Sequence, residues 1–451
     1  MRFYLLKMTT KGIKNIEKDL TLTFYSQTIS NKLNLRDTNV KSIFGMNGSG
    51  KSAIMNSVDI YKKLTTNRYF LTKIENRYLD NLINKKTHTF SCQMIYMMYD
   101  EENNNQNMGV FSHSISLCKK NDAYEIEKEV YSKLKKQSKT INGEYEKIFT
   151  INHGLLEFNS NIEEKLIKPI QKRTINLLNS ASIFALLPNI IKDIRENELK
   201  NDSSVSKNTS SILQGVLLGR YLAVFVSEED QHKNYDIKYE DYVEFVKEMS
   251  KNLNDSFEIN LDVNFEIVPK GHCVEYEKEI KKLELFIKKF KPSLNSISFE
   301  KKPMGDNFKY FLIFNYDNWS VDSEFESTGI KKLKQLFQYF QLVMIGGIVF
   351  IDELDANLHD VYLSRLILFF EKYAKGQLCF TSHNLGTMNE LKSYKNSIDF
   401  ITETCEIEQW KKNGNYTPYN QYRSGMIPNS PFNIEDFDFL DVFGDEDTEC
   451  K

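Results

Sequence analysis

The chain has few cysteines and no excess of charge of either sign. Its six cysteines among 451 residues form no C-x-x-C pair, so the sequence predicts neither a zinc knuckle nor a dense disulfide framework. We therefore expect a protein of the reducing cytoplasm. Lysine plus arginine number 59 against 62 for aspartate plus glutamate, a balance that excludes a disordered tail protein and a strongly basic nucleic-acid coat.

Long hydrophobic runs are also missing. The two most apolar stretches, residues 212–226 and 342–351, fall short of the roughly twenty apolar residues that a membrane-spanning helix needs, and Arg220 interrupts the first. Both are interpreted as buried core elements, so no membrane partner is expected. Residues 1–24 lack the basic segment, apolar core and cleavage site of a secretion signal.

The first third of the chain predicts strands around one helix. Residues 2–8 and 20–24 have the alternation of two strands, and 40–44 is a strand that leads into a glycine-rich turn. A helical pattern runs from Lys51 to about residue 64. Strand-like pieces fill residues 88–158.

The rest of the chain predicts helices first and an alternating pattern later. Residues 162–290 are mostly helical in pattern. A helix over 329–340, a very apolar strand over 343–351, a helix over 359–373 and a strand over 377–381 then predict a parallel pair with a right-handed crossover. Asn413-Gly414 predicts a tight hairpin.

A phosphate-binding motif follows the strand at 40–44. The run GMNGSGKS fits G-x-x-x-x-G-K-[ST], and its expected nucleotide-binding residues are Gly45, Asn47, Gly48, Ser49, Gly50, Lys51 and Ser52. Glycines let successive backbone N–H groups and the helix end point at phosphate oxygens. A glycine-rich turn can be only a turn, but the match and its strand-to-helix context predict ATP binding.

Two acids end the apolar strand. An ionised carboxylate at the end of a buried strand needs a compensating cation, and Asp352 together with the Ser52 hydroxyl would hold Mg²⁺. Glu353 is then placed to orient the attacking water. The plainer interpretation is a pair of exposed turn acids.

The segment ESTGIK, residues 326–331, resembles the signature motif of ABC-class ATPases. The resemblance implies that Ser327, Thr328, Gly329 and Lys331 grip the γ-phosphate of ATP held by a second subunit. Lys331 and Lys332 stand in the first turn, where the helix dipole would prefer acids. Either they are tolerated surface lysines, or an anion belongs at this helix end.

Further motifs of that class follow in the expected order. Asn357, Leu358 and His359 align with the D-loop, although transporter ATPases have Asp in place of His359. His383 closes the strand at 377–381 and resembles the switch histidine that binds the γ-phosphate; a packed core histidine is the alternative. For the glutamine loop, Gln93 is the candidate.

Several features narrow the resemblance. The D-loop, the Glu-Ser-Thr-Gly signature and the long insert resemble SMC-like ATPases of the OLD and abortive-infection type, and residues 410–432 resemble the end of phage-defence ATPases such as the PARIS ATPase subunit. The resemblance implies an α/β ABC-type P-loop ATPase head with a mixed or parallel sheet, helices and an antiparallel β lobe. Residues 1–158 and 293–451 would form the head, 159–292 an inserted helical arm or lid, and 433–451 an acidic tail.

This class implies a slow, Mg²⁺-dependent ATPase that dimerises head to tail around two ATP molecules. The function we expect is a switch of bacterial anti-phage defence, triggered by a phage protein and controlling a toxic partner. Only 68 residues follow His383, too few for a nuclease domain on top of the head, so the effector is expected to be a separate protein, such as a nuclease.

Three alternatives remain open at this point. A transporter ATPase is disfavoured by the long insert. A DNA-repair ATPase of the RecF or Rad50 sort would share every nucleotide motif; the net charge of -3 gives no general attraction to DNA, although lysines at 133–139 and 281–302 offer local charge. The third is a scaffold that nucleotide assembles without appreciable turnover.

Overall fold

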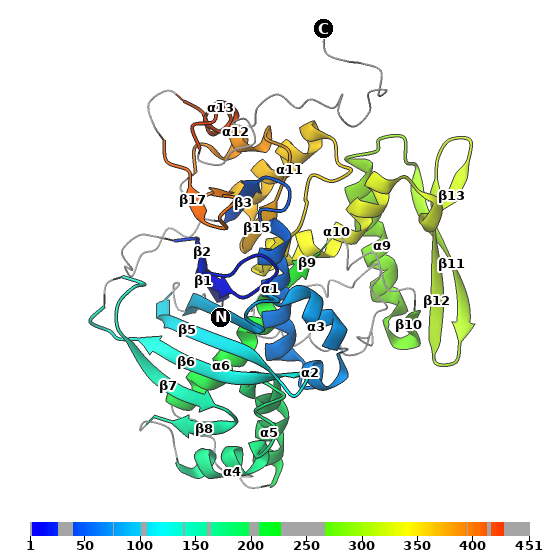
Figure 1. Ribbon diagram of the computed structural model, residues 1–451. Coiled ribbons are helices and arrows are strands. Elements are labelled where there is room, and N and C mark those ends of the chain that lie inside the picture. The colour runs from blue at the N-terminus through cyan, green and yellow to red at the C-terminus, as the bar shows by residue number, and fades with distance from the viewer. Residues whose placement is uncertain are drawn as a thin grey trace, which may run out of the picture.

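The computed structural model describes residues 2–25, 39–74, 76–100, 106–138, 140–159, 164–197, 207–226, 267–394, 396–412 and 416–427. Within these ranges the chain forms three sheets (Figure 1). A parallel sheet and a large antiparallel sheet enclose the first long helix, and a smaller antiparallel sheet projects from the side. The hairpin turn predicted at Asn413-Gly414 and the acidic tail predicted at 433–451 lie outside the described residues.

The central sheet carries the predicted motifs. Its strands, in spatial order, are β17 (Ile407–Gln409), β16 (Ile398–Ile401), β3 (Val40–Gly45), β15 (Gln377–Thr381), β14 (Ile348–Ile351) and β9 (Leu222–Phe225). All neighbours pair in parallel except β16 and β17. The strands predicted at 40–44 and 377–381 are thereby confirmed. Helices cover both faces, which explains why β9 and β14 are apolar along their whole length.

The strand predicted over 343–351 is too long. Helix α10 (Thr328–Ile345) continues into that range, and only Ile348–Ile351 is strand β14. Gly346, with φ 115°, closes the helix; this left-handed conformation favours glycine and often ends a helix. The continuous apolar run therefore joins the buried end of a helix to a buried strand.

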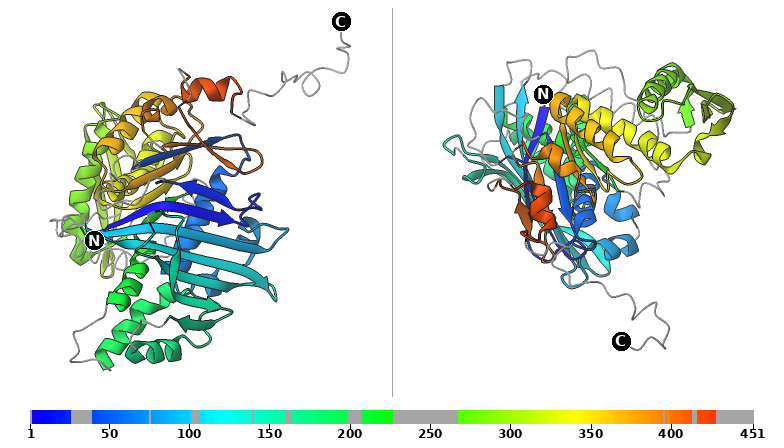
Figure 2. Two further views of the ribbon diagram at one scale, coloured as in Figure 1. Left: turned by 90° about the vertical axis from the view of Figure 1, so that its left-hand side faces the viewer. Right: turned by 90° about the horizontal axis from the view of Figure 1, so that it is seen from above.

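The large antiparallel sheet confirms the strands predicted near 2–8 and 20–24 and within 88–158. Its order is β2 (Leu20–Thr23), β1 (Arg2–Lys11), β4 (Thr89–Asp100), β5 (Gln106–Lys120), β6 (Ala123–Leu134), β7 (Tyr145–Asn152) and β8 (Leu155–Phe158). In the left view of Figure 2 it fans out below the parallel sheet. Helix α1 (Lys51–Thr66), as predicted, follows the glycine-rich turn and shares one apolar core with both sheets.

Further helices complete the two layers. Helices α2 (Phe70–Lys73) and α3 (Asn76–Leu82) follow α1 along the chain. On the other face of the parallel sheet, α10, α11 (Asp360–Tyr373) and α12 (Thr387–Leu391) share a second core with its strands, to which Tyr422 of α13 (Pro418–Arg423) also belongs. No helix among the described residues is long and apolar enough to cross a membrane.

The helical arm predicted at 159–292 needs correction. Helices α4 (Glu164–Thr174), α5 (Ile183–Asn197) and α6 (Lys207–Tyr221) adjoin the antiparallel sheet, and the chain then enters the central sheet as β9, which pairs with β14. This long-range pairing has no local signal. The described part of the range is therefore not one inserted unit.

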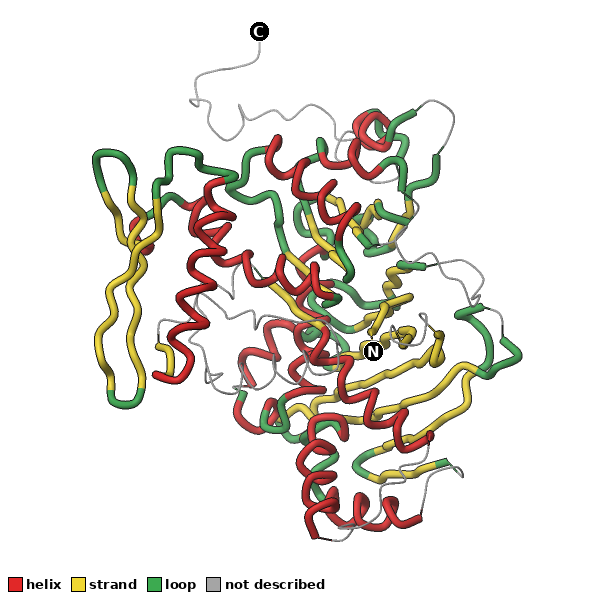
Figure 3. Tube along the Cα trace, turned by 180° about the vertical axis from the view of Figure 1, so that it is seen from behind, coloured by secondary structure: helices red, strands yellow, loops and turns green. Residues whose placement is uncertain are grey.

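The end of the predicted arm joins a separate lobe instead. Helix α9 (Cys273–Lys288) shares an apolar core with the second antiparallel sheet and with the start of α10. That sheet contains β10 (Ile267–Pro269), β11 (Ser296–Met304), β12 (Asn307–Asn315) and β13 (Ser320–Asp322), with 3₁₀ turns at Lys270–His272 and Ser323–Phe325. Figure 3 shows the β11–β12 hairpin at the outer edge with α9 beside it.

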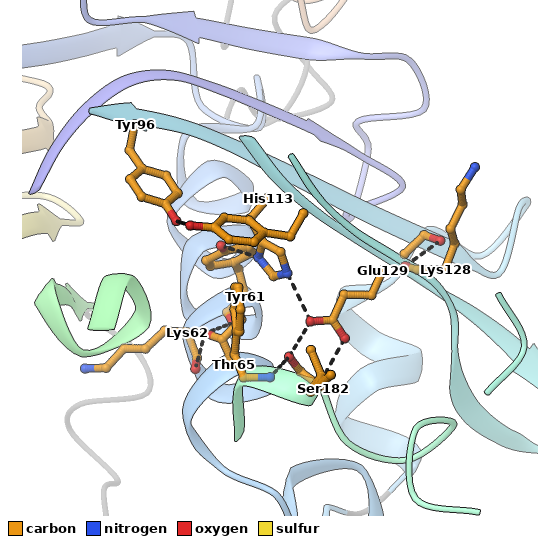
Figure 4. Close-up of polar contacts among 12 residues, drawn as sticks. Tyr61, Lys62, Thr65, Tyr96, His113, Lys128, Glu129 and Ser182 are labelled. Atoms are coloured by element: carbon orange, nitrogen blue, oxygen red, sulfur yellow. Dashed lines mark hydrogen bonds and ion pairs between the residues drawn. The ribbon is translucent and has the colours of Figure 1, made fainter. Parts of the chain in front are cut away.

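A buried polar cluster anchors α1 to its neighbours (Figure 4). We call Tyr61, His113, Glu129 and Ser182 the anchoring cluster. The Tyr61 hydroxyl lies 2.6 Å from His113 Nδ1, and His113 Nε2 lies 3.0 Å from Glu129 Oε1. Ser182 Oγ donates to the same carboxylate oxygen at 2.7 Å, and the Ile183 N–H donates to the other at 3.2 Å. These contacts join α1 to β5, β6 and the start of α5.

Candidate functional site

The carboxyl ends of three adjacent parallel strands bring the motifs to one edge of the central sheet. Strand β3 ends at Gly45, β15 at Thr381 and β14 at Ile351. Asp352 follows β14 directly, and His383 lies two residues beyond β15. Ligands of open parallel sheets bind at this edge. Segments more than three hundred residues apart in sequence thus meet in one place.

The glycine-rich turn has the conformation of a phosphate-binding loop. Gly48 and Gly50 have φ angles of 79° and 108°, which side chains other than glycine adopt at a penalty. A Cβ at Gly45 would lie 2.5 Å from Ile401 Cγ2. Helix α1 starts after Gly50 with no side-chain cap and no acidic residue in its first turn, so its positive end suits a phosphate.

Lys51 lies folded over its own loop. Its Nζ donates to the carbonyl oxygens of Gly45 at 2.8 Å and Met46 at 2.9 Å. Burial lowers the pKa of Lys51, and nearby carboxylates oppose that shift. Sequence reasoning missed Asn15, whose Nδ2 donates to the Gly48 carbonyl at 2.8 Å. Asn15 therefore braces the loop from the turn between β1 and β2.

The acids after β14 are organised by a residue on the neighbouring strand. Asp352 is 3% exposed, and its Oδ1 accepts a hydrogen bond from Thr381 Oγ1 at 2.6 Å. The same hydroxyl accepts the Glu353 N–H at 2.7 Å. Glu353 has φ 48°, a left-handed backbone that turns the chain sharply. Thr381 was not identified from the sequence because its role depends on the pairing of two strands.

These oxygen ligands fit Mg²⁺ only together with a nucleotide. Among the described residues, no cluster of three or more His, Cys, Asp or Glu side chains could hold a metal ion. Mg²⁺ typically binds one or two protein oxygens, phosphates and water. The buried Asp352 carboxylate and the Ser52 hydroxyl, in the first turn of α1, are suitable for that incomplete protein set.

A carboxylate absent from our sequence predictions holds the segment around His383. Asp355 accepts the backbone N–H groups of His383, at 3.1 Å to Oδ2, and of Asn384, at 3.0 Å. The Asn384 side chain donates to Asp360 Oδ1 at 2.7 Å. The His383 side chain is exposed, so the alternative of a packed core histidine is wrong.

The signature segment begins α10 at the surface. Ser327 is the N-cap residue, and its side chain makes no capping hydrogen bond; Ser327 and Thr328 are both exposed. A Cβ at Gly329 would lie 2.7 Å from the carbonyl oxygen of Asn357, so glycine allows the signature and the predicted D-loop to touch. Glu326 accepts hydrogen bonds from the Tyr316 hydroxyl and the Ser327 N–H.

The remaining predicted residues have simpler surroundings. Lys331 Nζ donates to the Glu324 carbonyl at 3.3 Å. Leu358 is partly buried against the second core of the parallel sheet and against the core around α9. His359 is exposed and its Nδ1 accepts the Val361 N–H at 3.3 Å, capping α11.

Gln93 lies elsewhere. It stands within β4 of the antiparallel sheet, where its Nε2 donates to Ser112 Oγ at 2.8 Å. The glutamine proposed for the glutamine loop is thus held by a cross-strand contact, and it is not among the side chains that bond the P-loop or the acids.

Fold and motif placement together define an α/β fold whose parallel sheet carries a P-loop at its carboxyl edge. A family model described as "AAA domain, putative AbiEii toxin, Type IV TA system" matches residues 216–389, which include the signature, the acids and His383 but not the P-loop. No curated protein matches the chain.

Three solved structures illustrate how distant the structural relatives are. The Smc head bound to the C-terminal winged-helix domain of ScpA is 13% identical, covers 90% of this chain and 98% of that one, and has a TM-score of 0.43. The Smc head domain with an extended coiled coil, bound to the C-terminal domain of ScpA derived from Pyrococcus furiosus, is 12% identical, with 91% and 96% covered and a TM-score of 0.39. RecF with ATP is 11% identical, with 91% and 98% covered and a TM-score of 0.36.

Proposed function

We propose that the protein is a slow, Mg²⁺-dependent ATPase that acts as the switch of a bacterial anti-phage defence system. Two heads pack head to tail around two ATP molecules. In each site Lys51 binds phosphate, Glu353 orients water and His383 contacts the γ-phosphate, while Ser327 and Gly329 come from the other head. Assembly then holds or releases a separately encoded toxic effector, such as a nuclease.

The observation that carries the ATPase proposal is the shared sheet edge. The P-loop, the Asp352-Glu353 turn and the segment around His383 lie there together, which supports a common role at one nucleotide. Ser327 is exposed with no capping bond to its own helix, which supports a contact in trans. A γ-phosphate gripped from both sides would make closure depend on ATP and relax after hydrolysis.

Phosphate release with four proteins tests the ATPase proposal. The parent should exceed both Lys51→Ala and Glu353→Gln by about a hundredfold or more, since positioned groups contribute at least that factor. Glu353→Gln should bind ATP and form a stable dimer in light scattering, and Ser327→Arg added to it should prevent that dimer. A parent no faster than Lys51→Ala would leave only a nucleotide-assembled scaffold.

The defence role draws on the family model, whose description names a putative toxin of a type IV toxin–antitoxin system. Cells that express this chain with its neighbouring gene should resist phage at the expense of their own growth, and Lys51→Ala should abolish that resistance. Unchanged resistance with Lys51→Ala would contradict an ATP-gated switch. DNA-dependent stimulation of turnover, without any protection, would favour a repair ATPase.

A further inference from the structure

One lysine of the signature helix is buried without a hydrogen bond. Lys332 is 6% exposed, and its Nζ is among the buried polar atoms that have no hydrogen-bond partner within the described part of the chain. The ammonium lies 4.1 Å from the centroid of the Phe225 ring, a cation–π contact that offsets only part of the desolvation of a charge. A buried ammonium without a hydrogen bond lowers the stability of the folded state, so its presence calls for an explanation.

The surroundings of Lys332 connect it to the acids. Phe225 pairs with Ile351, and the Phe225 carbonyl accepts the Asp352 N–H at 2.8 Å. Phe225 therefore contacts the Lys332 ammonium through its ring and the Asp352 backbone through its carbonyl. The ring of Tyr339, two turns along α10, packs edge-on against Phe225 at 5.6 Å.

Three carboxylates of the loop after β14 act on this ammonium. Burial lowers the pKa of Lys332 to about 8, and the carboxylates of Glu353, Asp352 and Asp355 oppose that shift, Glu353 most strongly. The ammonium form thus still prevails at neutral pH. These acids are therefore electrostatic partners of this lysine.

We propose that Lys332 is a positioning residue for ATP hydrolysis, which links the signature helix to the Glu353 carboxylate of the same head. The inference rests on the proposed ATPase function. When the start of α10 engages the nucleotide of the other head, a small movement of this helix would transfer the ammonium from the Phe225 ring toward Glu353. The carboxylate would then be held in the orientation that polarises water. Contact of α10 with the nucleotide of the other head would thereby change the position of Glu353 in its own head.

The test compares Lys332→Met with Lys332→Arg and with the control Lys372→Met. Methionine keeps the unbranched stem over Phe225 and removes the charge. Lys372 gives the same chemical change at an exposed place, with its Nζ 5.1 Å from the Tyr373 ring centroid. Turnover, KM for ATP, melting temperature without nucleotide, and the ATP-dependent dimer are measured for each full-length protein.

Lys332→Met should lower kcat about tenfold or more, with KM within about twofold and the dimer intact, and should raise the melting temperature because a buried charge is removed. Lys332→Arg should retain part of the turnover, and Lys372→Met should match the parent. Unchanged kcat, a raised KM with unchanged kcat, or a lowered melting temperature would each overturn the inference. A parent no faster than Lys51→Ala would instead overturn the ATPase proposal and the inference together.

Discussion

Two buried polar clusters of this head differ in how completely they are bonded. In the anchoring cluster, the Glu129 carboxylate is hydrogen-bonded to the His113 ring, the Ser182 hydroxyl and the Ile183 N–H. Near the carboxyl edge of the central sheet, the Lys332 ammonium has no hydrogen bond among the described residues and lies over the Phe225 ring. Complete bonding in a buried network rigidifies a fold, whereas an unbonded buried charge indicates an arrangement that another state completes. The first cluster therefore has a structural role, and for the second we propose a functional one.

The largest effect should follow from breaking the anchoring cluster. Glu129→Leu leaves His113 Nε2, Ser182 Oγ and the Ile183 N–H without their acceptor in the interior, so the free energy of unfolding should fall by about 3 kcal/mol or more. Urea unfolding followed by circular dichroism measures this loss. Glu125→Leu on the same strand is the control, because Glu125 is 36% exposed in its side chain and lies 4.0 Å from Lys120. Equal losses in the two variants would remove the distinction between the clusters.

A second prediction concerns the acids at the carboxyl edge of the central sheet. Thr381→Val removes the hydroxyl that bonds Asp352 and accepts the Glu353 N–H, so both acids lose their common support. We expect kcat to fall about tenfold, equivalent to roughly 1.4 kcal/mol, with little change in ATP affinity because Thr381 is not part of the P-loop. Single-turnover hydrolysis and nucleotide titration separate the two effects. Thr381→Ser should restore most of the rate; if it is as slow as Thr381→Val, the hydroxyl is not the supporting group.

The sequence alone predicted the elements whose signals are local. The strand before Gly45, the turn and helix α1 lie within a short segment, and each step has its own residue requirement. Asp352 and His383 were placed correctly at strand ends because apolar strands and helices alternate clearly there. Their arrival at one edge follows from the right-handed parallel connection.

The rest depends on contacts that no local pattern contains. Strand β9 was assigned to a helical arm because its pairing with β14 joins residues more than a hundred positions apart. Thr381 and Asp355 matter through hydrogen bonds to a neighbouring segment, and Lys332 reads in sequence as one of two adjacent surface lysines. Gln93 looked suitable by residue type, but its bond to Ser112 belongs to a sheet. Residue type indicates chemistry, and tertiary contacts decide its place.

The smallest effect provides the sharpest comparison. Tyr61→Phe removes one hydroxyl from the anchoring cluster, 2.6 Å from His113 Nδ1, and should lower the free energy of unfolding by about 1 kcal/mol while ATP turnover stays at the parent level. Lys332→Met should have the opposite pattern, a higher melting temperature and slower turnover. Thermal melts and steady-state phosphate release on both variants measure these opposite effects on stability and turnover. If Tyr61→Phe slows turnover as well, the anchoring cluster also tunes the P-loop through α1, and the two clusters act as one.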